Sequence, residues 1–238
     1  MEGKLVIIGD KAFIWYKGDL HTHKGVISKE KLKQYGRVET HKGVEAYILP
    51  LTIPDYIAKI KRGPAIIQPR DFGIITGLTG INKESIVVEA GTGSGAMAIM
   101  LANIVKMVYS YEKRKDFYRL AKKNIEKLGI KNIVLKNKDI YQGIDEKGVD
   151  LVFLDLPQPW LAVRPAFQAL KIGGFLVVYT PQISQAQELV RNAKGFIHVS
   201  TIQPSCIEWV IGEKILRPRH IQRIHTGFIT IMRKIEND

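Results

Sequence analysis

Apolar residues follow two different periods along the chain from residue 65 to the C-terminus. Short apolar, β-branched runs predict buried strands, and between them apolar residues recur every three or four positions, as on one face of a helix. The predicted strands cover residues 86–90, 107–112, 132–137, 149–155, 174–180, 196–203 and 226–233. The predicted helices cover residues 70–80, 94–105, 114–128, 160–170 and 183–193. This alternation predicts an α/β fold with a mostly parallel sheet covered on both faces.

The connection between the last two strands differs from the others. No helix long enough for a crossover separates residues 196–203 from 226–233, so we expect an antiparallel pair at one edge of the sheet. A nicotinamide-binding domain would continue with parallel crossovers. The ending therefore favours a class I Rossmann-like, S-adenosylmethionine-dependent methyltransferase fold with an antiparallel last strand.

The first 50 residues have a different pattern. Short β-rich pieces at 5–8, 13–16, 25–27 and 45–49 are interrupted by glycines and indicate a small barrel or sandwich. A helix is expected at 54–61, and the Arg62-Gly63-Pro64 turn after it indicates a boundary. We therefore predict a small β-rich domain with a linker helix at 1–62 and a catalytic domain at 63–238.

A glycine-rich loop follows the first strand of the second domain. Gly91, Gly93 and Gly95 let the backbone turn sharply and approach a ligand, and the helix predicted from residue 94 directs its N-terminus at the loop. This arrangement is typical of a nucleotide-type cofactor site. The spacing Gly91-x-Gly93-x-x-Ala96 also fits the dinucleotide fingerprint, so the loop alone does not identify the cofactor.

Four carboxylates occupy the predicted carboxyl ends of strands, where open α/β sheets bind ligands: Glu89, Glu112, Asp139 and Asp155. Glu112, 21 residues beyond Gly91, is placed to accept both hydroxyls of a ribose, and Asp139 to accept from an adenine amino group. Glu89 would attract the ammonium of S-adenosylmethionine and repel a pyrophosphate, which favours S-adenosylmethionine as cofactor. Any one of these carboxylates alone could be a surface residue or a helix cap.

The fourth strand of the second domain ends in the segment Asp155-Leu-Pro-Gln-Pro-Trp160. Asp155 can accept a hydrogen bond from an amino group and Trp160 offers a flat face for stacking, the combination that chemistry on an extruded base needs. The alternative is a helix cap with a core tryptophan. Beside a cofactor loop we favour Asp155 as the catalytic residue.

The formal net charge of +13 and the pI of 9.7 favour a polyanionic partner. We interpret the lysine-rich stretch 113–147 as the solvated face of a helix. Arg217, Arg219 and Arg223 cluster near the end of the chain and are better candidates for phosphate contact. Nucleic acid is therefore the favoured partner class.

Composition also bears on location and metals. Cys206 is the single cysteine; it excludes an intrachain disulfide, suits a reducing cytoplasm and is expected to be buried. No apolar run reaches the length of a membrane span, so no membrane association is expected. His21, His23 and His41 lack cysteine or carboxylate partners at ligand spacing, so we expect no metal site.

Several motifs together resemble the TrmI-type tRNA (adenine-N1)-methyltransferase family, over most of the chain. They are Glu89–Gly95, Tyr109–Glu112, Asp155–Trp160, Arg217-Pro218, His225-Thr-Gly-Phe228 and the approach segment from Lys61–Pro64 to Gln68-Pro-Arg-Asp71. The resemblance implies methylation of adenine at position 58 of the tRNA T-loop, with the adjacent purine at 57 as a second target in archaeal members. It also implies a homotetramer. The cofactor contacts it implies are Ser94, Gly95, Ala96, Met97, Glu112, Asp139 and Asp155.

Two positions depart from the family pattern. Gln68 stands where the family usually has Tyr or His, and Phe117 stands where bacterial members often have His, beside the adenine of the cofactor. We expect Gln68, Trp160 and His225 to lie on the substrate side with the three arginines.

Other functions remain open from the sequence. A methyltransferase for another RNA, a protein or a small molecule shares the loop and the acidic strand ends, but it leaves the charge and the 155–160 segment unexplained. A non-catalytic tRNA-binding subunit would not need an intact loop with Asp155. A nicotinamide oxidoreductase would need a proton relay such as Tyr-x-x-x-Lys, which the sequence does not show.

Overall fold

The computed structural model describes residues 3–61, 63, 66–220 and 225–237. The chain divides into two compact units, one of residues 1–61 with 126–129 and one of residues 62–125 with 130–238. Each unit has its own hydrophobic core.

The N-terminal unit is an antiparallel β structure. Four strands pair in the order β2-β1-β6-β5, and a separate two-stranded hairpin is formed by β3 and β4. The elements are β1 (Lys4–Ile8), β2 (Lys11–Trp15), β3 (Leu20–Thr22), β4 (Gly25–Ile27), α1 (Lys29–Leu32), β5 (Gly36–Glu39), β6 (Glu45–Pro50) and α2 (Ile53–Lys59). The predicted β-rich character is confirmed, whereas β3, β5 and the single turn α1 were not predicted.

The second unit is built on a seven-stranded sheet of order β12-β15-β11-β10-β7-β8-β9. Its strands are β7 (Ile86–Ala90), β8 (Met107–Tyr111), β9 (Ile133–Lys136), β10 (Val149–Asp155), β11 (Leu170–Thr180), β12 (Phe196–Ile202) and β15 (Phe228–Lys234). Strands β9, β8, β7, β10 and β11 are parallel, and β15 runs antiparallel to both β11 and β12. The mostly parallel sheet and the antiparallel pair at one edge are confirmed.

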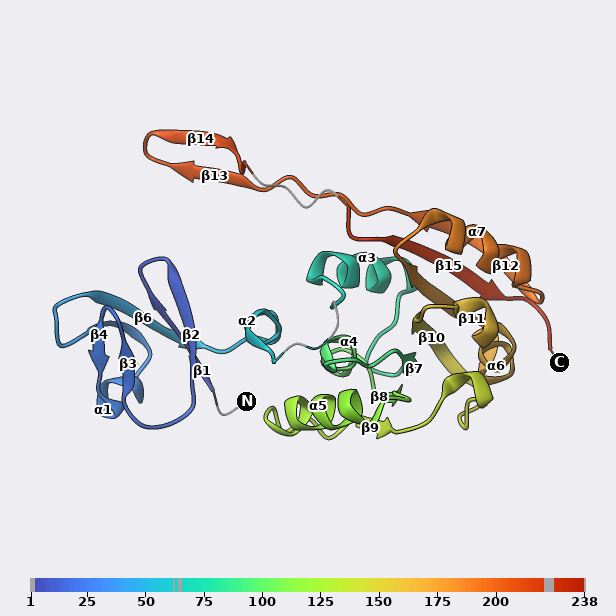
Figure 1. The fold of residues 1–238 in the computed structure, drawn as a ribbon, viewed down its shortest axis with the longest axis horizontal. Helices are drawn as coiled ribbons and strands as arrows, with labels where there is room; N and C mark the ends of the chain where they lie inside the picture. The colour runs from blue at the N-terminus through green and yellow to red at the C-terminus, as the bar shows by residue number, and fades with distance from the viewer. Residues whose placement is uncertain (1–2, 62, 64–65, 221–224, 238) are drawn as a thin grey trace. The chain divides into compact units, whose positions relative to one another are not determined.

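Helices cover both faces of this sheet (Figure 1). The helices are α3 (Pro69–Thr79), α4 (Ala96–Ala102), α5 (Lys115–Glu126), α6 (Val163–Ala169) and α7 (Ile183–Asn192), with single 3-10 turns η1 (Ile140–Gln142) and η2 (Pro159–Ala162). Helix α4 packs on β7 and β8, α6 packs on β10 and β11, and α7 packs on β11 and β15. The central strands β7 and β10 are therefore buried almost without interruption, as in a parallel sheet covered on both faces.

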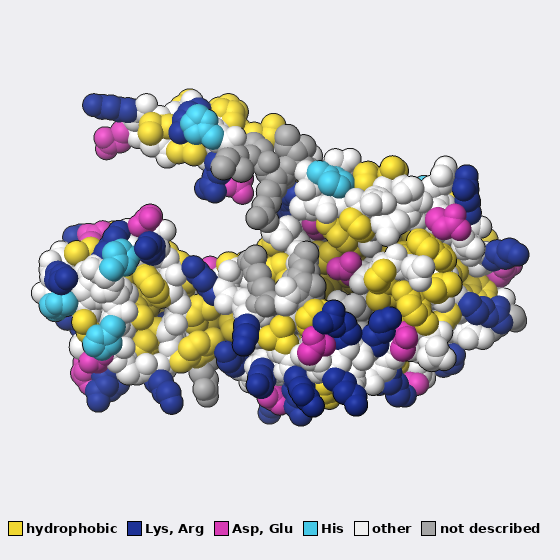
Figure 2. Space-filling view, in the orientation of Figure 1, with side chains coloured by type: hydrophobic (Ala, Val, Ile, Leu, Met, Phe, Trp, Pro, Cys, Tyr) yellow, Lys and Arg dark blue, Asp and Glu magenta, His cyan; other side chains and the backbone are white. Residues whose placement is uncertain are grey.

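The lysine-rich helix α5 matches its predicted amphipathic pattern. Ala121 and Ile125 are buried, and Lys115, Lys122 and Lys123 are exposed. Figure 2 shows lysine and arginine side chains gathered over this helix. The lysines of α5 therefore lie on its solvated face, as predicted, whereas Lys136 of the same stretch is largely buried, with 19% of its side chain exposed.

The chain between β12 and β15 holds an element that the sequence did not predict. Strands β13 (Trp209–Gly212) and β14 (Ile215–Pro218) form a separate antiparallel hairpin. Cys206 lies on the approach to it and is exposed, so the predicted burial of the thiol is wrong. None of the helices in the described part of the chain combines the length and apolar character needed to cross a membrane.

Candidate functional site

The glycine loop and the end of β10 touch through their backbones. Gly91 adopts a φ of 91°, a left-handed conformation that residues other than glycine rarely adopt. A Cβ atom at this position would lie 2.1 Å from the carbonyl oxygen of Asp155. Glycine at position 91 is therefore what lets the loop approach the residue that the sequence marks as catalytic.

A chain of buried hydroxyls holds the loop from below. The Ser110 hydroxyl donates to Glu89, and the hydroxyl oxygens of Ser110 and Thr92 lie 2.6 Å apart. On the other side of the loop, the Asn124 side chain donates to the carbonyl oxygen of Ser94 over 2.9 Å. Because these bonds come from β8 and α5, the loop is fixed to two neighbouring elements.

Glu89 is therefore an anchor beneath the loop and does not reach the surface of a cavity. It is 1% exposed, and burial raises the pKa of its carboxyl to about 8, a shift that the Ser110 hydrogen bond reduces. The predicted contact of Glu89 with a ligand ammonium stays a prediction. A carboxyl in this environment takes up a proton near neutral pH.

A cavity of about 390 Å³ lies above the loop, at the carboxyl ends of the central strands. We call it the strand-end cavity. The predicted residues that line it are Gly91, Gly93, Glu112, Phe117, Asp139 and Asp155. The structure adds Tyr111, Lys113, Arg114, Lys138, Ile140, Tyr141, Leu156, Pro157, Pro181 and Gln185. The volume is in the range of small-molecule sites, roughly 300–1,000 Å³.

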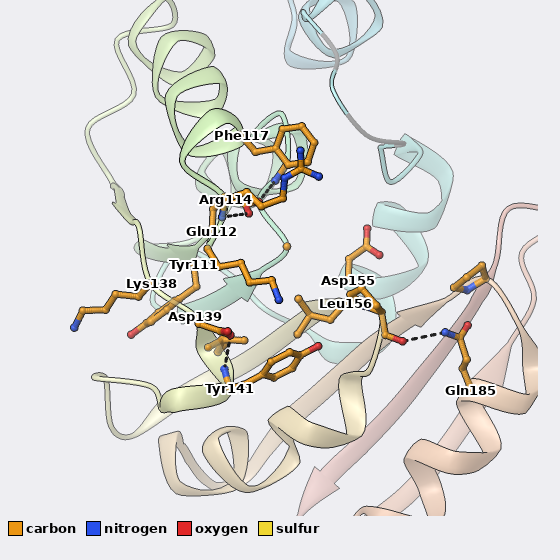
Figure 3. Close-up of a pocket in the computed structure, with 16 residues that line it drawn as sticks. Tyr111, Glu112, Arg114, Phe117, Lys138, Asp139, Tyr141, Asp155, Leu156 and Gln185 are labelled. Carbon is orange, nitrogen blue, oxygen red and sulfur yellow. Dashed lines mark hydrogen bonds between the residues drawn. The ribbon is translucent and has the colours of Figure 1, made fainter.

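Each part of the strand-end cavity combines a carboxylate with aromatic side chains, Glu112 with Phe117 in one part and Asp139 with Tyr141 in the other (Figure 3). Glu112 accepts hydrogen bonds from the backbone nitrogens of Gly93 and Arg114, both at 2.9 Å. Arg114 in turn stacks on Phe117, its guanidinium carbon 3.9 Å from the ring centroid. Each Glu112 oxygen still has a second lone pair for a ligand hydroxyl.

The opposite part of the cavity is formed by the segment that follows β9. Asp139 caps the 3-10 turn η1 by accepting from the backbone nitrogen of Tyr141 over 3.1 Å. Asp139 therefore performs the capping role that the sequence left open, and it also lines the cavity. Ile140 and Tyr141 supply an apolar wall next to it.

The remaining predicted cofactor residues lie behind the loop. Gly95 is the N-cap of α4, and Ala96 and Met97 are buried in its first turn. Ser94 is also buried, with its carbonyl bound by Asn124. None of residues 94–97 lines the strand-end cavity with a side chain, so a ligand there would contact them through the loop backbone.

Asp155 stands at the inner end of the cavity. Its side chain is half-buried, and desolvation raises the pKa of its carboxyl to about 7. The shift is typical of functional carboxylates, which sit in clefts where burial is not offset by a counter-ion.

Trp160 is not among the residues that line the strand-end cavity. The chain turns at Pro157 and Pro159 into η2, and the turn carries Trp160 to a second cavity of about 520 Å³, lined also by Arg164 and Phe167. The predicted stacking platform is therefore absent from the strand-end cavity.

The aromatic residue next to Asp155 is Tyr179. Strands β10 and β11 are parallel, and Asp155 is in register with Tyr179. Register partners lie on the same face of neighbouring strands about 4.8 Å apart, so the two side chains stand side by side. The sequence signal was present, since both residues end apolar strands, but the register was needed to pair them.

The other predicted substrate residues are spread over the second unit. Gln68 is the N-cap residue of α3 and donates to the carbonyl of Ile66 over 3.0 Å. His225 lies 3.3 Å from the carbonyl oxygen of Pro181, a residue of the strand-end cavity. Arg217 is on β14, and Arg219 follows it and pairs with Glu208 at 3.2 Å. Arg223 lies outside the described residues.

Comparison with known proteins identifies the family. The model of the family described as "tRNA methyltransferase complex GCD14 subunit" matches residues 46–226. The chain belongs to this family. The resemblance inferred from the sequence motifs is thus confirmed.

Two curated relatives and one solved structure are similar over nearly the whole chain. The tRNA (adenine(57)-N(1)/adenine(58)-N(1))-methyltransferase TrmI of Methanocaldococcus jannaschii is 33% identical, covering 89% of this chain and 86% of the relative. The tRNA (adenine(58)-N(1))-methyltransferase TrmI of Thermus thermophilus is 33% identical, with 91% and 89% covered. A SAM-dependent O-methyltransferase of Thermotoga maritima superimposes with a TM-score of 0.91 at 30% identity, covering 100% of this chain and 94% of that one. The fold is that of the SAM-dependent methyltransferases, as predicted.

Proposed function

We propose that this protein transfers a methyl group from S-adenosylmethionine to N1 of adenine in the T-loop of tRNA. The observation that carries the proposal is the backbone contact between Gly91 and Asp155, which joins a glycine-loop cavity to a half-buried carboxylate. The family match and the two TrmI relatives support tRNA adenine as the acceptor.

The strand-end cavity has the groups that S-adenosylmethionine requires. Glu112 would accept the ribose hydroxyls with the lone pairs that Gly93 and Arg114 leave over. Asp139 would accept from the adenine amino group, with Phe117 and Ile140 on the apolar faces of the ring. The bound cofactor supplies an electrophilic methyl group on a sulfonium.

The catalytic role we assign to Asp155 follows from the chemistry of adenine. N1 of adenine carries an in-plane lone pair, so no proton has to leave before it attacks the methyl group. The ionised Asp155 would accept a hydrogen bond from the N6 amino group, raise the electron density at N1 and stabilise the positive charge of the product ring. Because the pKa of Asp155 is raised to about 7, its ionisation is sensitive to small changes near neutral pH.

The decisive experiment compares two carboxylates on the same strand. Asp155→Asn should lose on the order of a hundredfold in single-turnover methylation of unmodified tRNA, with binding of S-adenosylhomocysteine retained. Asp150→Asn is the matched control, because Asp150 lies at the other end of β10, where it accepts from the backbone nitrogen of Ile86 over 2.7 Å. A near-normal rate for Asp155→Asn removes Asp155 from catalysis.

Nucleoside analysis of the product identifies the acceptor. We expect 1-methyladenosine, and mapping of the modified tRNA distinguishes position 58 alone from 57 and 58, the two patterns in the names of the relatives. The Thermotoga maritima neighbour is described as an O-methyltransferase. Methylation of an oxygen, or of a small molecule but not of tRNA, would contradict the adenine assignment.

The tRNA contacts and the assembly are also proposals. We assign Arg217 and Arg219 to the tRNA backbone, with Gln68 and His225 nearer the target base. Arg217→Ala should weaken tRNA binding and reduce its salt dependence by about one phosphate contact. We further propose a homotetramer, supported by apolar side chains on the β13–β14 hairpin such as Ile211 and Leu216, which are 78% and 73% exposed. Light scattering on the purified protein tests the tetramer.

A further inference from the structure

Two motifs far apart in the sequence meet at Tyr179. Thr226 donates a hydrogen bond to Asp71, with 3.3 Å between the Thr226 hydroxyl and Asp71 Oδ1. The Thr226 side chain also interacts with the Tyr179 hydroxyl, and this interaction lowers the pKa of the phenol. Asp71 is in the first turn of α3, Tyr179 is near the end of β11, and Thr226 precedes β15. One chain of bonds therefore connects three elements that are not sequence neighbours.

The direction of the protons follows from the donors available. A threonine hydroxyl has one proton, and the carboxylate of Asp71 can only accept, so the Thr226 hydroxyl donates its hydrogen bond to Asp71. The Thr226 oxygen keeps lone pairs that can accept from the Tyr179 hydroxyl. Asp71 is 0% exposed and is also paired with Arg70, whose Nε lies 3.4 Å from Oδ1. The Asp71 carboxylate is thus also held by the preceding residue of α3, Arg70.

Packing fixes the same ring from the other side. A Cβ atom on Gly227 would lie 2.5 Å from Cζ of Tyr179, so only glycine leaves room for the ring there. Two residues before Gly227, the His225 ring lies 3.3 Å from the carbonyl oxygen of Pro181. The segment 225–227 therefore runs beside the end of β11, in contact with the Tyr179 ring and with the backbone of Thr180.

We propose that Thr226 and Asp71 are positioning residues that hold the Tyr179 ring beside Asp155, on the side from which the methyl acceptor approaches. Tyr179 does not line the strand-end cavity, whereas its register partner Asp155 does. The ring thus borders Asp155 outside the cofactor region. The proposal deepens the tRNA methyltransferase function and rests on it for its catalytic consequence.

The kinetic test uses a threonine pair. Thr226→Val should lower the single-turnover rate with tRNA on the order of tenfold, while the affinity for S-adenosylhomocysteine stays within about twofold. Thr226→Ser keeps the hydroxyl and should restore most of the rate. Thr230→Val is the matched control, because Thr230 is on the following strand and its hydroxyl lies 3.2 Å from that of Thr201, away from Tyr179.

A double-mutant cycle separates positioning from general stability. Tyr179→Phe breaks the same chain, so the double variant with Thr226→Val should lose no more than the larger single loss. Losses that multiply, a wild-type rate for Thr226→Val, or an equal loss of cofactor affinity would each overturn the proposal.

A spectroscopic arm tests the chain without any activity. With ¹³C-tyrosine, the Cζ resonance that disappears in Tyr179→Phe should shift in Thr226→Val and stay in place in Thr230→Val. An unshifted resonance in Thr226→Val overturns the proposal even if the enzyme is active. If the wild-type protein fails to methylate tRNA but Thr226→Val shifts the resonance, the proposed function is refuted and the contact between Thr226 and Tyr179 still stands.

Discussion

Replacement of Gly91 by alanine tests whether the backbone contact between the glycine loop and Asp155 is what organises the site. The added Cβ would lie 2.1 Å from the Asp155 carbonyl oxygen, and the two atoms would have to separate by about 1 Å to reach normal contact. Since neither atom belongs to a flexible side chain, the loop or the end of β10 must move. Either movement changes the distance between the cofactor loop and Asp155.

The expected magnitude has two parts. Alanine in the left-handed region costs about 1–2 kcal/mol, and overpacking of a close contact adds about 1–3 kcal/mol. Gly80 isolates the first part, because it has a φ of 63° at the C-cap of α3 and a Cβ there meets no atom within 4 Å. Gly80→Ala should therefore lose only the conformational cost, and Gly91→Ala the sum of both.

Urea denaturation, calorimetry with S-adenosylhomocysteine and single-turnover kinetics measure these effects on both variants. A displacement of about 1 Å between reacting groups can cost on the order of a hundredfold in rate, which we expect for Gly91→Ala and not for Gly80→Ala. Wild-type cofactor affinity and rate in Gly91→Ala, or equal losses of stability in the two variants, would refute the reasoning.

Three further predictions concern buried charges. With tRNA at low concentration, the methylation rate should fall tenfold per pH unit below about pH 7, because Asp155 takes up a proton there. NMR titration should show a lower pKa of Asp155 with S-adenosylmethionine bound than with S-adenosylhomocysteine, because only S-adenosylmethionine carries a sulfonium charge. The pKa of Glu89 is raised to about 8, against 4.5 for a free side chain, so the contribution of Glu89 to the free energy of unfolding is complete below pH 4.5 and is lost as the pH rises towards 8. Glu89→Gln should remove this part of the pH dependence in denaturant titrations. Lys136 bridges Tyr111 and the carboxylate of Glu146 and so fixes the segment that follows the cavity wall. Lys136→Met should therefore weaken S-adenosylhomocysteine binding on the order of tenfold. Lys234 is a buried lysine that donates to carbonyls of α6 and β11, and Lys234→Met should lower stability alone.

The strands and helices that position the site were predictable because each has a strong local pattern. The run Ile86–Ala90 and the glycines after it predict both the strand and the turn, and the structure places them within a residue or two. Helix α5 was predictable for a similar reason, since its lysines and its apolar stripe repeat with the helical period. These signals depend on the residues themselves and not on distant partners.

The parts that failed depend on distant contacts. The burial of Glu89 beneath the loop follows from Ser110 and Thr92, and no period in the sequence reveals that contact. Trp160 was expected at the same cavity as Asp155 because the two are close in sequence, but after the turn with Pro157 and Pro159 it lines a different cavity. The hairpin of β13 and β14 has exposed apolar residues on both strands, so the alternation that normally identifies a half-buried strand is missing.

The acceptor side of the site is therefore assembled differently from the cofactor side. The cofactor side comes from the first strands of the sheet and their loops, in chain order, which is why six predicted residues line one cavity. The surroundings of Asp155 instead depend on the register between β10 and β11 and on Thr226, which is 155 residues from its partner Asp71. Because the folded sheet is what brings these residues together, changes in α3 or before β15 should alter the handling of the methyl acceptor while leaving cofactor binding almost unchanged.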